Sequence, residues 1–248
     1  MFSRTIAKII SKIPSSLKYR LSGLRPLYLH VIGLGEPAFN VKTTAGPLRW
    51  VKDGLTSQTF LLGTYEKEMQ EAFRRYVVPG SVVYDIGAHA GFHTLYCSLL
   101  VGPKGRVISF EPNPDNRASI ERQLAANPQA PVTLQPYAVS DRCGEVRLDT
   151  SRGSSRTRIT GDGDVLVESM TIDSLVAGNI VPPPDVIKID VEGHDLEVLK
   201  GAMQTVAKSR PTILCDYNTG INESGVEELL APLSYKVRGG AIIVALPE

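Results

Sequence analysis

Three titratable side chains, Asp190, Glu192 and His194, lie within five residues of the chain. Histidine has an unperturbed pKa of about 6.5, so it can accept a proton near neutral pH, and a neighbouring carboxylate can orient it. The spacing therefore predicts an acid–base cluster in which His194 is the first candidate for the catalytic base and Asp190 and Glu192 assist it. The simpler alternative is that Asp190 or Glu192 caps the helix expected to follow.

A second group of residues is typical of a nucleoside site. An apolar run ends at Asp85 and turns at Gly87, and a helical pattern begins at Gly91. Glycine is needed where a side chain would block the backbone angles of a tight turn or the approach of a ligand. The next apolar run, residues 106–110, ends at Glu111, where a carboxylate can accept hydrogen bonds from both hydroxyls of a ribose.

The spacing of the glycines argues against a dinucleotide. The fingerprint G-x-G-x-x-G requires glycine at positions 89 and 92, where this chain has His89 and Phe92, so a pyrophosphate is poorly accommodated. A nucleoside without phosphates, such as S-adenosylmethionine, needs only space beside the turn and a carboxylate for its ribose. The residues therefore favour S-adenosylmethionine over NAD. The alternative is an α/β core turn with an incidental acidic residue.

Apolar periodicity places these residues on alternating strands and helices. Strands are expected at residues 82–84, 106–110, 132–134, 186–189 and 213–215, and a closing hairpin at 235–238 and 241–245. This order predicts an α/β fold with a Rossmann-like, doubly wound sheet. Ligands of such sheets bind at the carboxyl ends of the strands, which would bring Asp190 opposite Gly87.

Two further acidic residues have two interpretations each. Glu66 lies in the first turn of a helix expected over residues 65–76, where the helix dipole favours a carboxylate, but it can equally lie at the mouth of the site. Asp141 follows the third strand, where it can accept a hydrogen bond from an adenine amine. An Asp-Arg-Cys-Gly turn explains Asp141 equally well.

Composition limits the classes of function. The 248 residues are 42% hydrophobic and 21% charged, as in ordinary soluble domains, and the net charge of +1 gives no reason to expect a nucleic-acid partner. Three widely spaced cysteines without a C-x-x-C pair indicate a reducing compartment, with neither a disulfide framework nor a zinc site. No ligand spacing demands a metal, although a divalent cation bound by Asp190 and Glu192 is an alternative. A cytoplasmic location is expected.

The N-terminal residues 1–25 contain basic but no acidic side chains, with Ile6, Ile9, Ile10, Ile13 and Leu17 at helical spacing. This pattern is typical of a basic amphipathic helix that docks on an anionic membrane surface. An organelle-targeting segment and a solvated or substrate-capping helix are the alternatives. Residues 1–62 are therefore interpreted as an arm and lead-in, and residues 63–248 as the functional domain, with a β-hairpin insertion near 145–170.

Five motifs, in this order, resemble the FkbM family of S-adenosylmethionine-dependent methyltransferases of the class I fold. They are Gly63-Thr-Tyr-Glu66, Asp85-Ile-Gly-Ala-His-Ala-Gly91, Phe110-Glu-Pro-Asn-Pro114, Ala138-Val-Ser-Asp141 and Ile187-Lys-Ile-Asp-Val-Glu-Gly193. The resemblance implies a seven-stranded, mostly parallel sheet with an antiparallel last strand. It also implies S-adenosylmethionine as cofactor and O-methylation of a hydroxyl on a sugar, glycolipid or natural product.

The motifs that carry the resemblance predict cofactor contacts at Glu66, Asp85, Gly87, His89, Gly91, Glu111, Asp141 and Asp190. The family often has asparagine where His89 stands, and glutamate where Asp216 stands at the end of a later strand, which bears on the acceptor side. Two alternatives to a methyltransferase stay open at this point: an NAD-type oxidoreductase and a non-catalytic nucleoside-binding module.

Overall fold

The computed structural model describes residues 38–151, 153, 157–217 and 223–248. The basic arm of residues 1–25 lies outside these residues, so its predicted membrane contact stays a prediction. Residues 39–248 form one compact unit, which includes the lead-in from Phe39 onward. None of the described helices combines the length and the apolar character needed to cross a membrane.

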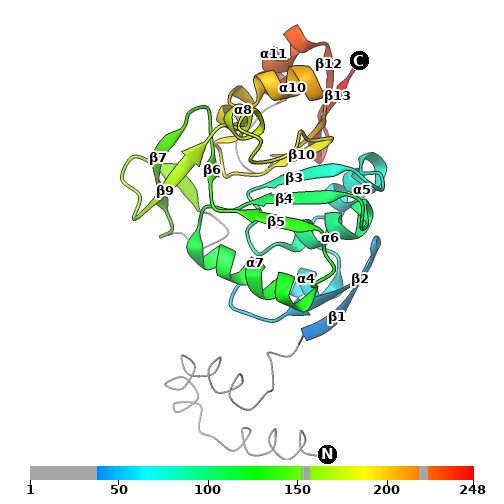
Figure 1. Cartoon of the computed structure of the whole chain (residues 1–248). Helices are drawn as coiled ribbons and strands as arrows, with labels where there is room; N and C mark the ends of the chain where they lie inside the picture. Colours follow the sequence, from blue (N-terminus) through cyan, green and yellow to red (C-terminus); the bar gives the residue numbers. More distant parts are fainter. Residues whose placement is uncertain (1–37, 152, 154–156, 218–222) are drawn as a thin grey trace, which may run out of the picture. The chain divides into compact units, whose positions relative to one another are not determined.

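A seven-stranded sheet forms the centre of this unit (Figure 1). In spatial order its strands are β12 (Tyr235–Arg238), β13 (Ile242–Pro247), β11 (Thr212–Asp216), β10 (Val186–Ile189), β3 (Val82–Ile86), β4 (Arg106–Phe110) and β5 (Val132–Gln135). The five strands from β11 to β5 pair in parallel, and β13 is antiparallel to both of its neighbours. The predicted seven-stranded α/β sheet and its closing hairpin are confirmed.

Helices cover both faces of the sheet, as the near-continuous apolar runs of parallel strands require. Alternate strand residues such as Val83 and Val107 pack with helices α5 (Lys67–Tyr76) and α6 (Phe92–Val101). Their neighbours Tyr84 and Ile108 face the opposite core cluster. That cluster includes residues of α8 (Ile172–Ala177), α9 (Asp195–Lys200), α10 (Met203–Ser209) and α11 (Glu223–Leu230).

The lead-in forms strands β1 (Ala38–Thr43) and β2 (Gly46–Val51) and helix α4 (Gln58–Leu62), and β2 lies against helix α7 (Pro114–Ala126). Two amide side chains, one from α7 and one from its C-cap residue, form hydrogen bonds with the backbone of β2. Gln123 exchanges two hydrogen bonds with Val51 (2.8 and 2.9 Å), and Asn127 exchanges two with Arg49 (2.9 and 2.6 Å). These amides therefore pair with backbone N–H and C=O groups of β2, as the backbone of a neighbouring strand would.

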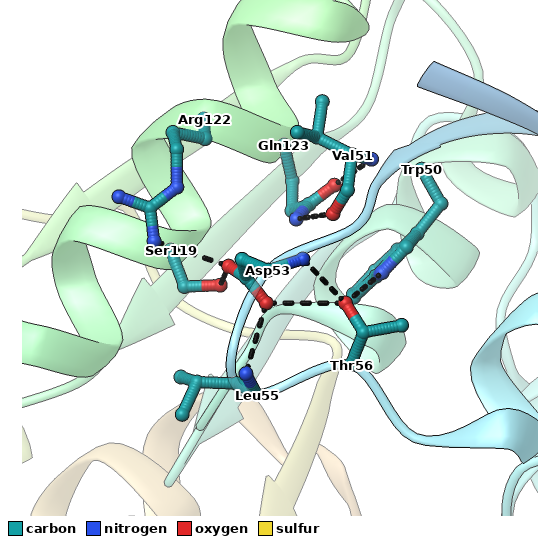
Figure 2. Close-up of polar contacts among 8 residues, drawn as sticks. All are labelled: Trp50, Val51, Asp53, Leu55, Thr56, Ser119, Arg122 and Gln123. Atoms are coloured by element: carbon teal, nitrogen blue, oxygen red, sulfur yellow. Dashed lines mark hydrogen bonds and ion pairs between the residues drawn. The ribbon is translucent and has the colours of Figure 1, made fainter. Parts of the chain in front are cut away.

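Asp53 closes the same contact just beyond β2 (Figure 2). Its carboxylate accepts hydrogen bonds from Ser119 and Arg122 of α7, and from Leu55 and Thr56 of its own turn. Burial opposes ionisation, but these hydrogen bonds lower the pKa of Asp53 below its ordinary value. The lead-in is thereby joined to the helix that follows Glu111.

A second, four-stranded sheet occupies the region predicted as a hairpin insertion. Its order is β6 (Ala138–Val139), β9 (Val165–Met170), β7 (Gly144–Asp149) and β8 (Arg158–Thr160). Strands β7 and β9 pair antiparallel where the hairpin was expected. The structure adds β8, which pairs with β7 within the segment predicted to be a hairpin.

Candidate active site

The turn after β3 is fixed by its backbone and by its neighbour β10. Gly87 has a φ of +79°, and the N–H groups of Gly87 and Ala88 donate to the carbonyl of Phe110 at the end of β4 (3.0 and 3.2 Å). A Cβ atom on Gly87 would lie 1.9 Å from the carbonyl oxygen of Asp190. Glycine is therefore required both for its positive φ and for the close approach of β10.

Glu111 is held beside this turn by the residues that surround it. Its Oε2 accepts from the backbone N–H of His89 (2.8 Å), and its Oε1 accepts from the N–H of Asn113 (2.9 Å) and from Asn116 Nδ2 (3.2 Å). Burial raises its pKa to about 7, although these hydrogen bonds act in the opposite direction. Because a carboxylate has about four acceptor sites, capacity remains for a ligand hydroxyl.

A pocket opens between this turn, the end of β10 and the second sheet. Its volume is about 920 Å³ when the space open to solvent at its mouth is included. Apolar lining residues come from both sheets: Ile86, Phe110, Val139, Leu148 and Ile159. The second sheet is attached to the site, since Asn113 Nδ2 donates to Thr157 Oγ1 (3.1 Å) beside β8. The inserted strands thus supply one wall of the pocket.

Three carboxylates gather on the wall: Glu66, Asp190 and Asp216 each offer an oxygen within 4.8 Å of the others. Like charges at this distance disfavour full ionisation unless a cation compensates them. Burial raises the pKa of Glu66 to about 7, partly offset by a hydrogen bond from Tyr65. This end of the pocket is therefore suited to a positively charged group.

Six of the predicted site residues line the pocket: Glu66, Gly87, His89, Glu111, Asp190 and Glu192. His89 has a φ of +51°, and burial lowers its pKa to about 4, so its imidazole is neutral at pH 7. Glu192 has a φ of +53° in the loop between β10 and α9. The structure thus brings together residues that are far apart in the sequence.

Four other predicted residues are not among the described residues that line the pocket: Asp85, Gly91, Asp141 and His194. Asp85 is fully enclosed, and its oxygens contact Thr94 Oγ1 (2.6 Å) and Lys188 Nζ (3.1 Å). Gly91 is the N-cap residue of α6. Asp141 is exposed and accepts from Ser140. The predicted base, His194, shares a hydrogen bond between its Nε2 and Ser140 Oγ (2.8 Å).

The sequence interpretation missed Lys188, which is 2% exposed and pairs with Asp85 and Asp190. It related Asp216 to the acceptor side but did not predict its proximity to Glu66 and Asp190. For Lys188 a signal existed: a lone lysine within the apolar run 186–189, on a strand expected to be covered on both faces. Its meaning depended on the partners that the fold would provide.

Comparison of the sequence with known proteins identifies related methyltransferases. The sequence profile of the methyltransferase FkbM domain matches residues 85–235. Hexuronic acid methyltransferase AglP of Haloferax volcanii is 32% identical over 154 residues, which are 60% of this chain and 61% of that protein. The 2-O-methyltransferase NoeI of Sinorhizobium fredii is 26% identical over 152 residues, which are 53% of this chain and 61% of that protein. The chain thus spans about 61% of the length of these two relatives.

The fold has a match among solved structures. The precorrin-6y C5,15-methyltransferase of Geobacter metallireducens superposes with a TM-score of 0.51 over 78% of this chain and 93% of that chain, at 16% identity. This likeness shows a shared α/β fold. The domain match covers most of the chain, from the start of the glycine turn to the closing hairpin. On this basis the chain belongs to the FkbM family of methyltransferases.

Proposed function

We propose that this protein is an S-adenosylmethionine-dependent methyltransferase that O-methylates a hydroxyl of a sugar, a glycolipid or a related natural product. The observation that carries the proposal is Glu111, a buried carboxylate that the backbone of His89 in the glycine-turn segment holds at the pocket wall. The names of AglP and NoeI, a hexuronic acid methyltransferase and a 2-O-methyltransferase, support a carbohydrate acceptor.

The lining residues fit the parts of this cofactor. Glu111 would accept hydrogen bonds from the ribose, and the apolar residues Val139, Leu148 and Ile159 would contact the adenine. The carboxylates of Glu66, Asp190 and Asp216 suit the ammonium and sulfonium charges. When bound, S-adenosylmethionine supplies an electrophilic methyl group on sulfur. The protein must align an acceptor hydroxyl with that group, exclude water and remove the hydroxyl proton.

For proton removal we favour Glu66 over the base predicted from the sequence, His194. Glu66 lines the pocket and burial raises its pKa to about 7, which suits a base at neutral pH. The imidazole of His194 bonds to Ser140. Asp190 then holds the cofactor's amino group, and Glu192 faces the acceptor side. If Glu66 instead contacts the cofactor, as the sequence predicted, its substitution should change the cofactor affinity. This measurement separates that role from the role of a catalytic base.

Methyl transfer is the direct test of the proposal. The protein is incubated with S-adenosylmethionine carrying a labelled methyl group and a panel of glycosides with free hydroxyls, with and without a hexuronic acid. Label is expected on a glycoside, and Glu111→Ala should lower the cofactor affinity by about 10- to 100-fold, the range of a hydrogen bond to a charged group. Glu121→Ala on the exposed face of α7 is the control. Unchanged cofactor binding by Glu111→Ala would refute the assigned ribose contact.

A further inference from the structure

Lys188 lies in the middle of β10 and contacts both strand ends that form the site. Its Nζ is 3.1 Å from Asp85 Oδ1 and 3.5 Å from Asp190 Oδ2. It also donates to the carbonyl oxygens of Gly87 (2.8 Å) and Ile86 (3.4 Å). The contacts to β3 and the glycine turn cross about a hundred residues of sequence. One side chain therefore joins the glycine turn to the acidic end of the pocket.

The surroundings keep this buried side chain charged. Burial alone would lower the pKa of Lys188, but the carboxylates of Asp85, Asp190 and Glu66 raise it above its ordinary value. An ammonium with 2% exposure is tolerated only when its donors are paired in this way. The contacts of Lys188 thus favour a positive charge next to the pocket wall.

Lys188 also favours the ionised form of the Asp190 carboxylate. Burial raises the pKa of Asp190 above its ordinary value, and the carboxylates of Asp216, Asp195 and Asp85 act in the same direction, whereas Lys188 opposes this rise. Without the ammonium, Asp190 would be protonated more readily, and a protonated carboxyl attracts a cation weakly. The side chain of Asp190 is 21% exposed on the pocket side, whereas Lys188 has almost no exposed surface.

We propose that Lys188 is a positioning residue that acts through Asp190: it holds this carboxylate beside the glycine turn so that Asp190 can bind the ammonium group of the cofactor's amino-acid tail. This inference rests on the proposed function. The alternative is that Lys188 only stabilises the fold through its ion pair with Asp85. In that case its removal should weaken the binding of the nucleoside and of the amino-acid tail alike. A role through Asp190 affects only ligands that carry the tail.

Two thioether ligands separate these roles. S-adenosylhomocysteine carries the amino-acid tail, and methylthioadenosine has the same nucleoside without it. Calorimetry on Lys188→Met should show S-adenosylhomocysteine affinity reduced by about 10- to 100-fold, as expected for the loss of a charge-assisted hydrogen bond, with methylthioadenosine affinity unchanged. Lys200→Met, an exposed lysine in α9, is the matched control and should change neither affinity.

Removal of Lys188 leaves the Asp85 carboxylate buried without its cation, which can prevent folding. The variant Asp85→Asn/Lys188→Met removes both charges and serves as a second test, with its melting curve recorded first. A double-mutant cycle completes the design: in an Asp190→Asn background, Lys188→Met should cause no further loss of S-adenosylhomocysteine affinity.

The outcomes are distinct. Selective loss of S-adenosylhomocysteine binding together with non-additivity with Asp190→Asn supports the inference. Equal loss of both ligands, or additive losses in the cycle, overturns it and leaves Lys188 a structural residue. If the unaltered protein binds neither S-adenosylmethionine nor S-adenosylhomocysteine, the proposed function itself fails, irrespective of any Lys188 variant.

Discussion

Glu66 has an unusual backbone conformation for a residue with a side chain. Its φ of +40° is in the left-handed region, and it occupies the N-cap position of α5 without capping the helix. Its carboxylate lines the pocket instead, with Oε2 3.5 Å from Nε2 of the buried His93. Strained conformations persist only where the surrounding structure enforces them, and they cluster at functional sites. This supports a chemical role for Glu66.

A catalytic Glu66 predicts a specific pH dependence. The base must be ionised, and burial raises its pKa to about 7, so turnover should rise with pH up to about 7 and then level off. Glu66→Gln should lower kcat by about 10²–10⁴-fold and abolish this rise, because glutamine cannot accept the proton. The measurement is a pH–rate profile at saturating cofactor and acceptor, with the cofactor Kd determined separately.

His194→Gln is the comparison for this prediction. We expect it to preserve the pH profile, since the imidazole bonds to Ser140 and does not line the described pocket. A loss of the rise in His194→Gln, with an altered cofactor Kd but normal kcat in Glu66→Gln, would restore the roles predicted from the sequence for both residues.

At the scale of elements, β3 and β10 meet at one point. The carbonyl of Asp190 occupies the space where a Gly87 side chain would begin, and the N–H of Asp190 donates to Ile86 (3.1 Å). Lys188 bonds to the same turn. The glycine turn and the position of Asp190 in the acidic wall are therefore set by the packing of two adjacent strand ends.

Gly87→Ala tests this packing. The new Cβ would meet the Asp190 carbonyl at 1.9 Å in addition to its unfavourable φ, so we expect the free energy of unfolding to fall by more than the roughly 1–3 kcal/mol of the φ penalty alone. Gly80→Ala is the control, because Gly80 also has a positive φ (+94°) and no neighbouring atom lies within 4 Å of its added Cβ. Urea denaturation gives both values; equal losses would show that β10 does not constrain the turn.

The contact between the lead-in and α7 gives a second prediction at this scale. Hydrogen bonds lower the pKa of Asp53, so its stabilising effect is complete above the unfolded value of 3.8 and is lost as pH falls through the lower folded value. Asp53→Asn should therefore reduce the free energy of unfolding by about 1.5–3 kcal/mol at pH 7, with the difference shrinking below pH 4.

Denaturation of Asp53→Asn at a series of pH values tests this, with the exposed Asp162→Asn as control. A destabilisation that is independent of pH down to pH 3 would mean that the carboxylate charge does not carry the contact. The α7 helix begins directly after the Glu111 segment, and Asn113 caps it. The lead-in therefore packs against the helix that begins next to Glu111.

At the scale of the whole unit, the pocket is lined by residues from both sheets and from the loops after β3, β4 and β10. A ligand that binds there can form its full set of contacts only in the folded state. S-adenosylmethionine at a hundred times its Kd should therefore raise the free energy of unfolding by about 2.7 kcal/mol. For a domain of this size we expect the Tm to rise by roughly 5–11 °C.

Thermal melts with S-adenosylmethionine and with NAD at equal concentration measure this effect. NAD should leave the Tm unchanged, since the turn lacks the second and third glycines of a pyrophosphate site. A rise in Tm with NAD but not with S-adenosylmethionine would support the oxidoreductase alternative.

Much of the fold was predictable because it depends on local patterns. The period of apolar residues located the strands of the main sheet, the helix expected over residues 65–76 and the helix that begins after Gly91. Strand β8 was not found, because it pairs with β7 across a polar segment and carries little periodicity of its own. The hydrogen bonds of Gln123 and Asn127 to β2 have no local signal either.

The sequence by itself determined the alternation of strands and helices, the glycine turn at Gly87 and the acidic residue Glu111 at the next strand end, because spacing and residue type are local properties. Only the tertiary structure decided that Lys188 would pair with Asp85, that Glu66 and Asp216 would meet Asp190, and that His194 would bond to Ser140. These contacts join residues far apart in the chain. Their geometry depends on strand order and side-chain packing, which no local pattern specifies.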